Sequence, residues 1–374
     1  MAYIKSIEIN KFRGIKQLSV SGFSNINLIV GDNNCGKTTL LEAIQLLFAK
    51  PQLGSIKPVI DQRTVLSPDK SSFYVSFVKM FNMEESKDQL EFDIYADSKG
   101  GVLRFQISGN EKIITGEEAL QISSLSSRQK TQYKRGTAFL PENARIFTGR
   151  IAKQVGKKIT EDAVRFTSID SLASLPDIKK EVNYIPSFGH MRYDLLQNIV
   201  DDLDYKKLVI DILRQFDKDI ADICYTKADD GVFLETIITK SGITMPFSVY
   251  GDGIKKILYI LNRLYAASGS ILLIDEIETG LHKKYFDILF PIVFELAKKF
   301  SVQLFIATHS IEAIDAILRY GNYDNSEEKE DPIKVITLKK VDFGNGFESN
   351  VVARNVTGKY VYDNRMAFDF EVRL

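Results

Sequence analysis

The stretch that decides the fold is "INLIVGDNNCGKTTLLEAIQLLFA", residues 26–49. It joins a short apolar run, a loop bounded by two glycines, and a segment whose apolar residues recur at helical spacing. The loop fits the pattern G-x-x-x-x-G-K-[ST], in which backbone N–H groups close around phosphates at a helix N-terminus. The sequence therefore predicts a phosphate-binding loop between a buried strand and a helix.

The loop pattern assigns a role to each of its side chains. Lys37 is expected to reach the β- and γ-phosphates of a nucleotide, and the Thr38 hydroxyl to bind Mg²⁺. Cys35 occupies a variable position, where a small filler is favoured over redox control. The full set of loop residues expected around the nucleotide is Gly31, Asn33, Asn34, Cys35, Gly36, Lys37, Thr38 and Thr39.

Two later apolar strands end in polar side chains. "SILLIDEIETGLH", residues 270–282, predicts Asp275 beside Mg²⁺ and Glu276 where an attacking water would sit. "FIATHS", residues 305–310, places His309 at a strand end, as a candidate γ-phosphate contact. A plain strand end and a surface histidine are the structural alternatives. The adjacent acids favour an ATPase over a Ras-like GTPase, because the guanine-reading Asn-Lys-x-Asp is missing.

A helix opened by two glycines precedes the acidic strand. "SVYGDGIKKIL", residues 248–258, carries Gly251 and Gly253 at the start of an amphipathic helix. Such a helix N-terminus attracts anions, although a Gly-x-Gly alone is more often a turn. Its place between the phosphate loop and the acidic strand makes it informative.

Together these motifs resemble the ABC-class ATPases, and within them the OLD-type (overcoming-lysogenization-defect) and RecF-like AAA ATPases. The segments that carry the resemblance are "INKFRGIKQLSV", "GDNNCGKTTLLEAI", "YGDGIKKIL", "IDEIETGLH" and "IATHS". The resemblance implies an α/β fold: an ABC-type P-loop domain with a mixed sheet, an antiparallel β subregion and a partly helical insertion. It implies ATP and Mg²⁺ as cofactors. It also places Arg13 near the nucleotide, with a surface arginine closing a strand as the alternative.

The resemblance further implies assembly. In ABC-class ATPases the signature helix of one copy covers the nucleotide held by another, so a homodimer or a larger even-numbered assembly is expected. Two departures from the transporter pattern matter: Tyr250 stands near the place of the signature serine, and residues 279–282, Thr-Gly-Leu-His, replace the transporter D-loop. No Q-loop glutamine can be placed.

The chain divides into three regions at this stage: residues 1–108 with Walker A, a basic insertion or lid at 109–200, and residues 201–374 with the signature, Walker B and switch histidine. Segments 73–81, 90–96 and 101–108 are predicted as antiparallel strands, the insertion as weakly helical, and 208–223 as one helix. Residues 233–247 predict a hairpin around Ser241-Gly242.

Composition bounds the function. Lysine plus arginine balances aspartate plus glutamate, 49 against 49, so nucleic-acid binding would require a local patch. Residues 128–158 supply one candidate, with Glu142 as the single acid and Tyr133, Phe139 and Phe147 interleaved for base stacking. A solvated face or a protein-binding site is the alternative. The basic residues are Arg128, Lys130, Lys134, Arg135, Arg145, Arg150, Lys153, Lys157 and Lys158.

Two cysteines and an N-terminus without an apolar core predict a cytoplasmic protein without membrane contact. The 238 positions between Lys37 and Asp275 disfavour a transporter domain, and no heptad pattern supports an SMC-type clamp. Only 65 residues follow His309, fewer than a Toprim nuclease domain requires. The sequence therefore predicts an ATPase that regulates a separately encoded effector in anti-phage defence, with a RecF-like ATPase acting on DNA as the alternative.

Overall fold

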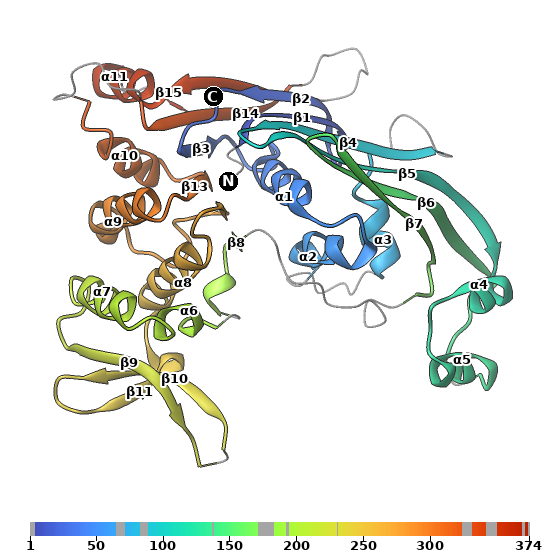
Figure 1. Cartoon of the computed structure of the whole chain (residues 1–374), viewed down its shortest axis with the longest axis horizontal. Coiled ribbons are helices and arrows are strands. Elements are labelled where there is room, and N and C mark those ends of the chain that lie inside the picture. The colour runs from blue at the N-terminus through green and yellow to red at the C-terminus, as the bar shows by residue number, and fades with distance from the viewer. Residues whose placement is uncertain are drawn as a thin grey trace.

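The computed structural model describes residues 4–64, 72–82, 89–136, 138–170, 183–191, 194–229, 231–323, 331–341, 350–368 and 371–372. Within these residues the named strands form three sheets, and helices cover them (Figure 1). Among the described residues, no helix combines the length and the apolar character that a membrane crossing needs.

The central sheet has the strand order β15-β14-β3-β13-β12-β8. Five of these strands run parallel to one another, and the edge strand β15 is antiparallel to its neighbour β14. The parallel strands are β3, β8, β12, β13 and β14. Since the carboxyl ends of parallel strands meet at one edge, the residues that follow β3, β12 and β13 gather there. The strands are β3 (Ile26–Val30), β8 (Asn183–Ile185), β12 (Ile271–Ile274), β13 (Gln303–Ala307), β14 (Ile333–Val341) and β15 (Asn350–Thr357).

Both faces of this sheet are buried, which explains the apolar runs of β12 (ILLI) and of residues 304–307 in β13 (LFIA). Leu272 and Ile274 pack in one core with the helices that follow β8, whereas Ile271 and Leu273 pack in a second core with α1 (Lys37–Phe48). The helices of the first core are α6 (Gln197–Val200), α7 (Leu203–Leu213), α8 (Asp252–Ala266), α9 (Phe286–Lys299), α10 (Ile311–Arg319) and α11 (Gly358–Phe368).

A long antiparallel sheet of order β2-β1-β4-β5-β6-β7 arches over α1, α2 (Leu53–Thr64) and α3 (Phe73–Val78) (Figure 1). Its inner face is rich in aromatic side chains: the Phe77 ring lies 4.9 Å from those of Phe147 and Phe166. The strands are β1 (Ile4–Phe12), β2 (Ile15–Ser21), β4 (Gln89–Ser98), β5 (Gly101–Thr115), β6 (Asn143–Val155) and β7 (Lys158–Thr167).

The structure corrects three predicted elements. Residues 73–81 are not a strand: α3 forms there, opened by Ser72, whose hydroxyl accepts the Val75 N–H, and its aromatic residues pack under the sheet. The region from 109 onward is mostly strand, because β5 continues to Thr115 and pairs along its length with β6. Of the described residues between β5 and β7, only those of α4 (Gly116–Ile122) and α5 (Ser127–Lys134) are helical. The helix predicted at 208–223 ends at Leu213.

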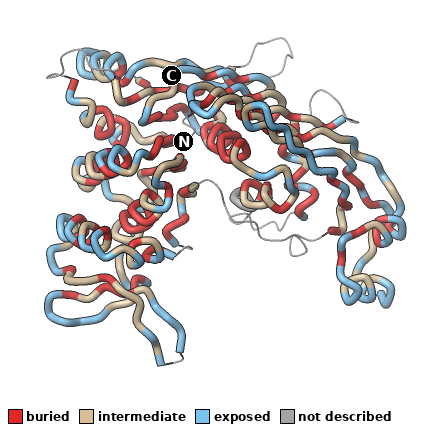
Figure 2. The backbone as a smooth tube through the Cα atoms, viewed as in Figure 1, coloured by how far each residue is buried: buried red, intermediate tan, exposed pale blue. Residues whose placement is uncertain are grey.

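The remainder of 208–223 enters a small sheet of order β11-β10-β9, with β9 (Ile220–Lys227), β10 (Phe233–Thr239) and β11 (Thr244–Pro246). The predicted hairpin is confirmed, and Gly242 takes the left-handed conformation its turn requires, with φ of +82°. Figure 2 shows that this sheet is largely exposed at its outer end. Most of the acidic loop at 321–331 lies outside the described residues.

Candidate nucleotide site

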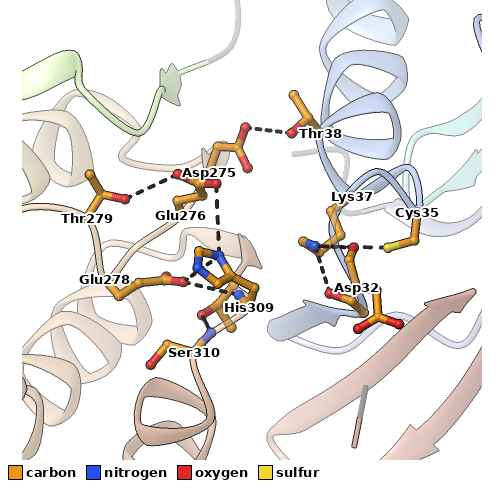
Figure 3. A network of polar contacts seen from close by, with 12 residues as sticks. Asp32, Cys35, Lys37, Thr38, Asp275, Glu276, Glu278, Thr279, His309 and Ser310 are labelled. Carbon is orange, nitrogen blue, oxygen red and sulfur yellow. Dashed lines mark hydrogen bonds and ion pairs between the residues drawn. The ribbon is translucent and has the colours of Figure 1, made fainter. Parts of the chain in front are cut away.

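The phosphate-binding loop follows β3 and is held in a tight conformation. A Cβ at Gly31 would lie 2.2 Å from the Leu338 carbonyl oxygen, so only glycine fits there. Gly36, with φ of +99°, leads into α1. The buried Lys37 Nζ donates to the carbonyl oxygens of Gly31 (2.7 Å) and Asp32 (2.8 Å) (Figure 3). The lysine therefore lies back across its own loop.

The loop meets the acidic strand through one direct hydrogen bond. Thr38 Oγ1 donates to Asp275 Oδ2 over 2.9 Å (Figure 3). The buried Tyr184, from the edge strand β8, donates its hydroxyl to the same oxygen over 3.1 Å. Burial raises the pKa of the Asp275 carboxyl, as does the nearby charge of Glu276, while these two hydrogen bonds oppose the shift. The structure thus joins two residues predicted as metal ligands, 237 positions apart.

These groups suit a magnesium ion. A hydroxyl and a carboxylate are hard oxygen donors, which Mg²⁺ prefers over nitrogen or sulfur. The buried carboxylate of Asp275 lies in the field of Glu276 and Glu42, and a cation would compensate this concentration of negative charge. Thr38 and Asp275 therefore fit the ion that the phosphate loop implies.

Glu276 directly follows Asp275 and adopts a left-handed backbone, with φ of 46°. Such a conformation is costly for a non-glycine residue and is often found at functional sites. Thr279 Oγ1 donates to Glu276 Oε2 over 3.3 Å. Glu276 is among the residues that line the same cavity as the loop.

His309 lies across from this turn, at the end of β13. Its Nδ1 is 3.2 Å from Glu278 Oε1 and 3.9 Å from Glu276 Oε1 (Figure 3). Its backbone N–H also donates to Glu278 Oε1, over 3.1 Å. The structure thus brings His309 beside the acidic turn, whereas the cavity next to the phosphate loop is lined by other residues.

That cavity has a volume of about 530 Å³. Asn33, Asn34, Gly36, Lys37, Thr38 and Thr39 line it from the loop, and Asp275 and Glu276 from the acidic strand. Two walls were not predicted. Lys340 and Val351 come from β14 and β15, Gly14 comes from the turn after β1, and Ile15 is the first residue of β2. The sequence held no signal for Lys340, because an exposed lysine at a strand end is common.

Cys35 faces inward rather than toward the cavity. The thiol is buried, and its Sγ lies 4.0 Å from Lys37 Nζ. Burial raises the pKa of the thiol, with the Lys37 charge opposing the shift, so the reactive thiolate is disfavoured. This environment favours the interpretation of Cys35 as a small packing residue.

Arg13 lines the cavity, but its guanidinium forms an ion pair with a neighbouring side chain of the protein. Its Nε lies 2.7 Å from Glu42 Oε2, and its terminal nitrogen donates to Glu42 Oε1 over 3.2 Å. The Glu42 side chain is fully buried in α1. Arg13 is therefore a structural residue that pairs with a buried carboxylate, and not a simple surface arginine. Its contact with nucleotide stays a prediction.

Arg13→Met should lower the free energy of unfolding by about 3–5 kcal/mol, because the Glu42 carboxylate would stay buried without its guanidinium. Arg13→Met combined with Glu42→Met should recover most of this loss, since the double variant buries no lone charge. Urea denaturation followed by circular dichroism measures both. If Arg13→Met keeps its stability but loses nucleotide affinity, the arginine serves the nucleotide and not the fold.

The glycine-opened helix stands apart from the cavity. Gly251 caps α8 and is exposed, while Gly253 lies near the Gly280 carbonyl and the Tyr285 ring. Neither glycine is among the residues that line the cavity. Within one copy, the structure therefore does not bring the predicted signature residues to the loop that would hold the nucleotide.

Three residues near the acidic turn escaped the sequence reasoning: Tyr184, Glu278 and Lys256. Lys256 of α8 is fully buried, donates from Nζ to the Ser187 carbonyl over 3.0 Å, and lies in the field of the acids. Burial lowers the pKa of its ammonium to about 8 against the opposing effect of Glu278. Of these three residues, only Glu278 could have been noticed from the sequence, because it stands two positions after Glu276 in the acidic motif.

The basic segment does not form one patch. Phe147 is fully buried in the aromatic cluster, so the prediction that it stacks on bases is wrong. Four of the basic side chains have partners: Arg145 with Glu111, Arg150 with Glu161, Lys153 with the Phe48 carbonyl, and Lys130 with the Gln121 carbonyl. The exposed remainder divides between α5 (Arg128, Lys134, Arg135) and the β6–β7 turn (Lys157, Lys158). The strand β6, 13 residues and about 40 Å long at ~3.3 Å per residue, lies between the two groups along the chain.

The fold and the site define a class: a P-loop protein of mixed α/β architecture, whose phosphate loop, acidic strand and histidine strand lie side by side. A family model described as "AAA domain, putative AbiEii toxin, Type IV TA system" matches residues 26–315. The chain belongs to this family of AAA-domain proteins.

Individual relatives agree with this assignment. A Helicobacter pylori protein named "ATP/GTP phosphatase" is 24% identical over 358 residues, which cover 86% of this chain and 90% of that protein. The DNA replication and repair protein RecF of Clostridium beijerinckii is 31% identical over 101 residues, 27% of this chain and 26% of RecF. An SMC head bound to the C-terminal winged-helix domain of ScpA has the same fold, with a TM-score of 0.50, 11% identity, and coverage of 96% of this chain and 99% of that one.

Proposed function

We propose that this chain is a Mg²⁺-dependent ATPase that closes as a homodimer around nucleotide and thereby controls a separately encoded effector in anti-phage defence. The observation that carries the ATPase part is the contact between Thr38 and Asp275, which unites the phosphate loop and the acidic strand. The family description calls the AAA-domain protein itself a "putative AbiEii toxin" of a toxin–antitoxin system; such a system has two components, which supports a second polypeptide as the partner.

The roles of the side chains follow from their positions. Lys37 Nζ donates hydrogen bonds to two carbonyl oxygens of its own loop. Phosphate oxygens are stronger acceptors, so a bound nucleotide would take the place of these carbonyls as the partner of the ammonium group. Glu276 would orient the attacking water or accept its proton. His309, beside the same turn, would contact the γ-phosphate. Bound Mg²⁺ would neutralise charge on the phosphate oxygens, with Thr38 and Asp275 as its protein ligands.

Dimerisation is supported by the absence of the signature helix from the cavity lining of a single copy. Gly251 and Gly253 open a 15-residue helix, whose N-terminus favours anions, yet they lie outside the cavity. A second copy would bring this helix end over the open side of the triphosphate. Donors from two directions would then surround the γ-phosphate, where a single copy leaves it in water.

The effector is tested by comparing what co-purifies with two variants. Glu276→Gln should hold ATP and keep the closed dimer, so it should capture one effector polypeptide from the native host in the presence of ATP. Lys37→Ala, which should not bind ATP, is the matched control and should capture none. Mass spectrometry identifies the polypeptide, and phage challenge of cells carrying Lys37→Ala measures lost protection. Equal capture by both variants would contradict nucleotide control.

The RecF-like alternative, an ATPase that acts directly on DNA, is favoured by the partial match to RecF and by the exposed basic side chains of α5 and the β6–β7 turn. In the same purification this alternative predicts DNA in place of a protein. Reversal of Lys157 and Lys158 to Glu should then weaken DNA binding and reduce its dependence on salt.

A further inference from the structure

Tyr184 is a buried tyrosine whose hydroxyl reaches the centre of the site. It belongs to β8, the edge strand that pairs in parallel with β12, where Tyr184 stands opposite Leu273. Only 6% of the residue is exposed. From there its hydroxyl donates to Asp275 Oδ2 over 3.1 Å.

The Asp275 carboxylate is thereby held from two sides. Its Oδ2 accepts from Thr38 on the phosphate loop and from Tyr184 on β8. The Asp275 N–H also donates to the Ile185 carbonyl over 2.9 Å, so the strand that carries Tyr184 fixes the backbone as well. Of these two side-chain donors, Thr38 is itself expected to serve the metal, whereas Tyr184 is not.

The segment that carries Tyr184 is firmly anchored. Lys256 Nζ of α8 holds the Ser187 carbonyl over 3.0 Å. A Cβ at Gly189 would lie 2.6 Å from the Tyr259 ring, so α8 and this segment are in close contact. His190 packs against Gly280, where a Cβ would lie 2.9 Å from its Nε2. The tyrosine hydroxyl is therefore presented from a fixed support, as positioning of a metal ligand requires.

We propose that Tyr184 is a positioning residue that fixes the Asp275 carboxylate for Mg²⁺ and so sets the affinity of the nucleotide site for the divalent cation. This inference rests on the proposed function, which assigns Asp275 to the metal. Groups that hydrogen-bond a metal ligand without touching the metal hold its orientation, and their loss typically weakens metal affinity by about 10–100-fold.

Tyr184→Phe tests the inference because it removes one oxygen and keeps the ring in the core. The readout is the Mg²⁺ concentration that half-saturates the complex of the protein with a non-hydrolysable ATP analogue, measured by calorimetry. We expect this concentration to rise about 10-fold or more. Affinity for the analogue without Mg²⁺ should be unchanged, because Tyr184 does not line the cavity.

Tyr205→Phe is the matched control. Tyr205 is equally buried, and its hydroxyl donates to the Leu261 carbonyl over 2.8 Å, remote from Asp275. It should leave Mg²⁺ affinity as in the natural protein, while thermal melting shows that both variants fold. If Tyr184→Phe folds and binds Mg²⁺ normally, the inference is overturned.

A third variant separates this outcome from failure of the proposed function. Asp275→Asn should weaken Mg²⁺ binding strongly if Asp275 serves the metal. Weak binding by Asp275→Asn together with normal binding by Tyr184→Phe would overturn the role of the tyrosine alone. Normal binding by Asp275→Asn would overturn the metal assignment and the inference with it.

Discussion

Glu276→Gln should bind ATP as well as the natural protein does and hydrolyse it about 100-fold or more slowly. An amide keeps the shape of the side chain but cannot accept a proton, and general-base catalysis typically contributes about 10²–10⁴-fold. Glu276 is the candidate because it lines the same cavity as Lys37 and Thr38. Its left-handed backbone, with φ of 46°, costs conformational energy, and such strain is often found where the position of a side chain serves function.

Glu278→Gln is the control for this experiment. Glu278 lies on the same turn, and its Oε1 accepts the His309 N–H and lies 3.2 Å from His309 Nδ1, two contacts that an amide oxygen could keep. We expect a loss of less than about 10-fold for Glu278→Gln, below the about 10²–10⁴-fold that general-base catalysis contributes, because Glu278 accepts no proton in the proposed mechanism. Phosphate release gives the turnover and equilibrium binding of a fluorescent ATP analogue gives the affinity. Full turnover in Glu276→Gln would remove it from the mechanism.

Two inactive variants should restore activity when they are combined. Lys37→Ala should damage the phosphate loop, and Gly253→Asp should place a negative charge where the signature helix faces the triphosphate of another copy. A Cβ at Gly253 meets only ordinary contacts, the nearest 3.6 Å away, so this variant should fold and act through charge. Each variant alone should lose nearly all ATPase activity.

Random mixing makes half of the dimers heterodimers, and each of these has one intact composite site of two. About a quarter of the natural activity should therefore return, if the sites act independently. Lys37→Ala mixed with Asp275→Asn is the control, because both changes damage the same half-site and no mixture of them is intact. Subunit exchange is verified with two affinity tags. Exchange without recovery would mean that each copy builds its own site.

Much of the site could be predicted because its motifs are local. The loop from Gly31 to Thr38 and the pair at Asp275 and Glu276 each combine a buried strand with polar residues directly after it, and the parallel sheet brings these strand ends together. The central strands and helices were confirmed for the same reason. Their apolar periodicity reflects burial on one or two faces.

What could not be predicted depends on partners far along the chain. Tyr184 lies 91 positions from Asp275 in the sequence. No local pattern distinguishes it from other tyrosines, because what sets it apart is the distant carboxylate that accepts its hydrogen bond. Residues 73–81 are mostly apolar and aromatic, with only Ser76 and Lys79 polar, which fits a strand as well as a helix. The choice was made by packing of Phe73 and Phe77 under the arched sheet. Likewise, the second half of β5 and the first six residues of β7 bury neither face, so these stretches lack the apolar–polar alternation of a half-buried strand.

The position of β14 has a consequence for biosynthesis. The phosphate loop emerges from the ribosome early, at residues 31–38, yet the strand that closes against it spans Ile333–Val341. The Leu338 carbonyl borders Gly31, and Lys340 completes a wall of the cavity. A nascent chain without β14 has the motif but not the site. We therefore expect the chain to become able to bind nucleotide only late in translation, and a truncated product of premature termination to lack this ability.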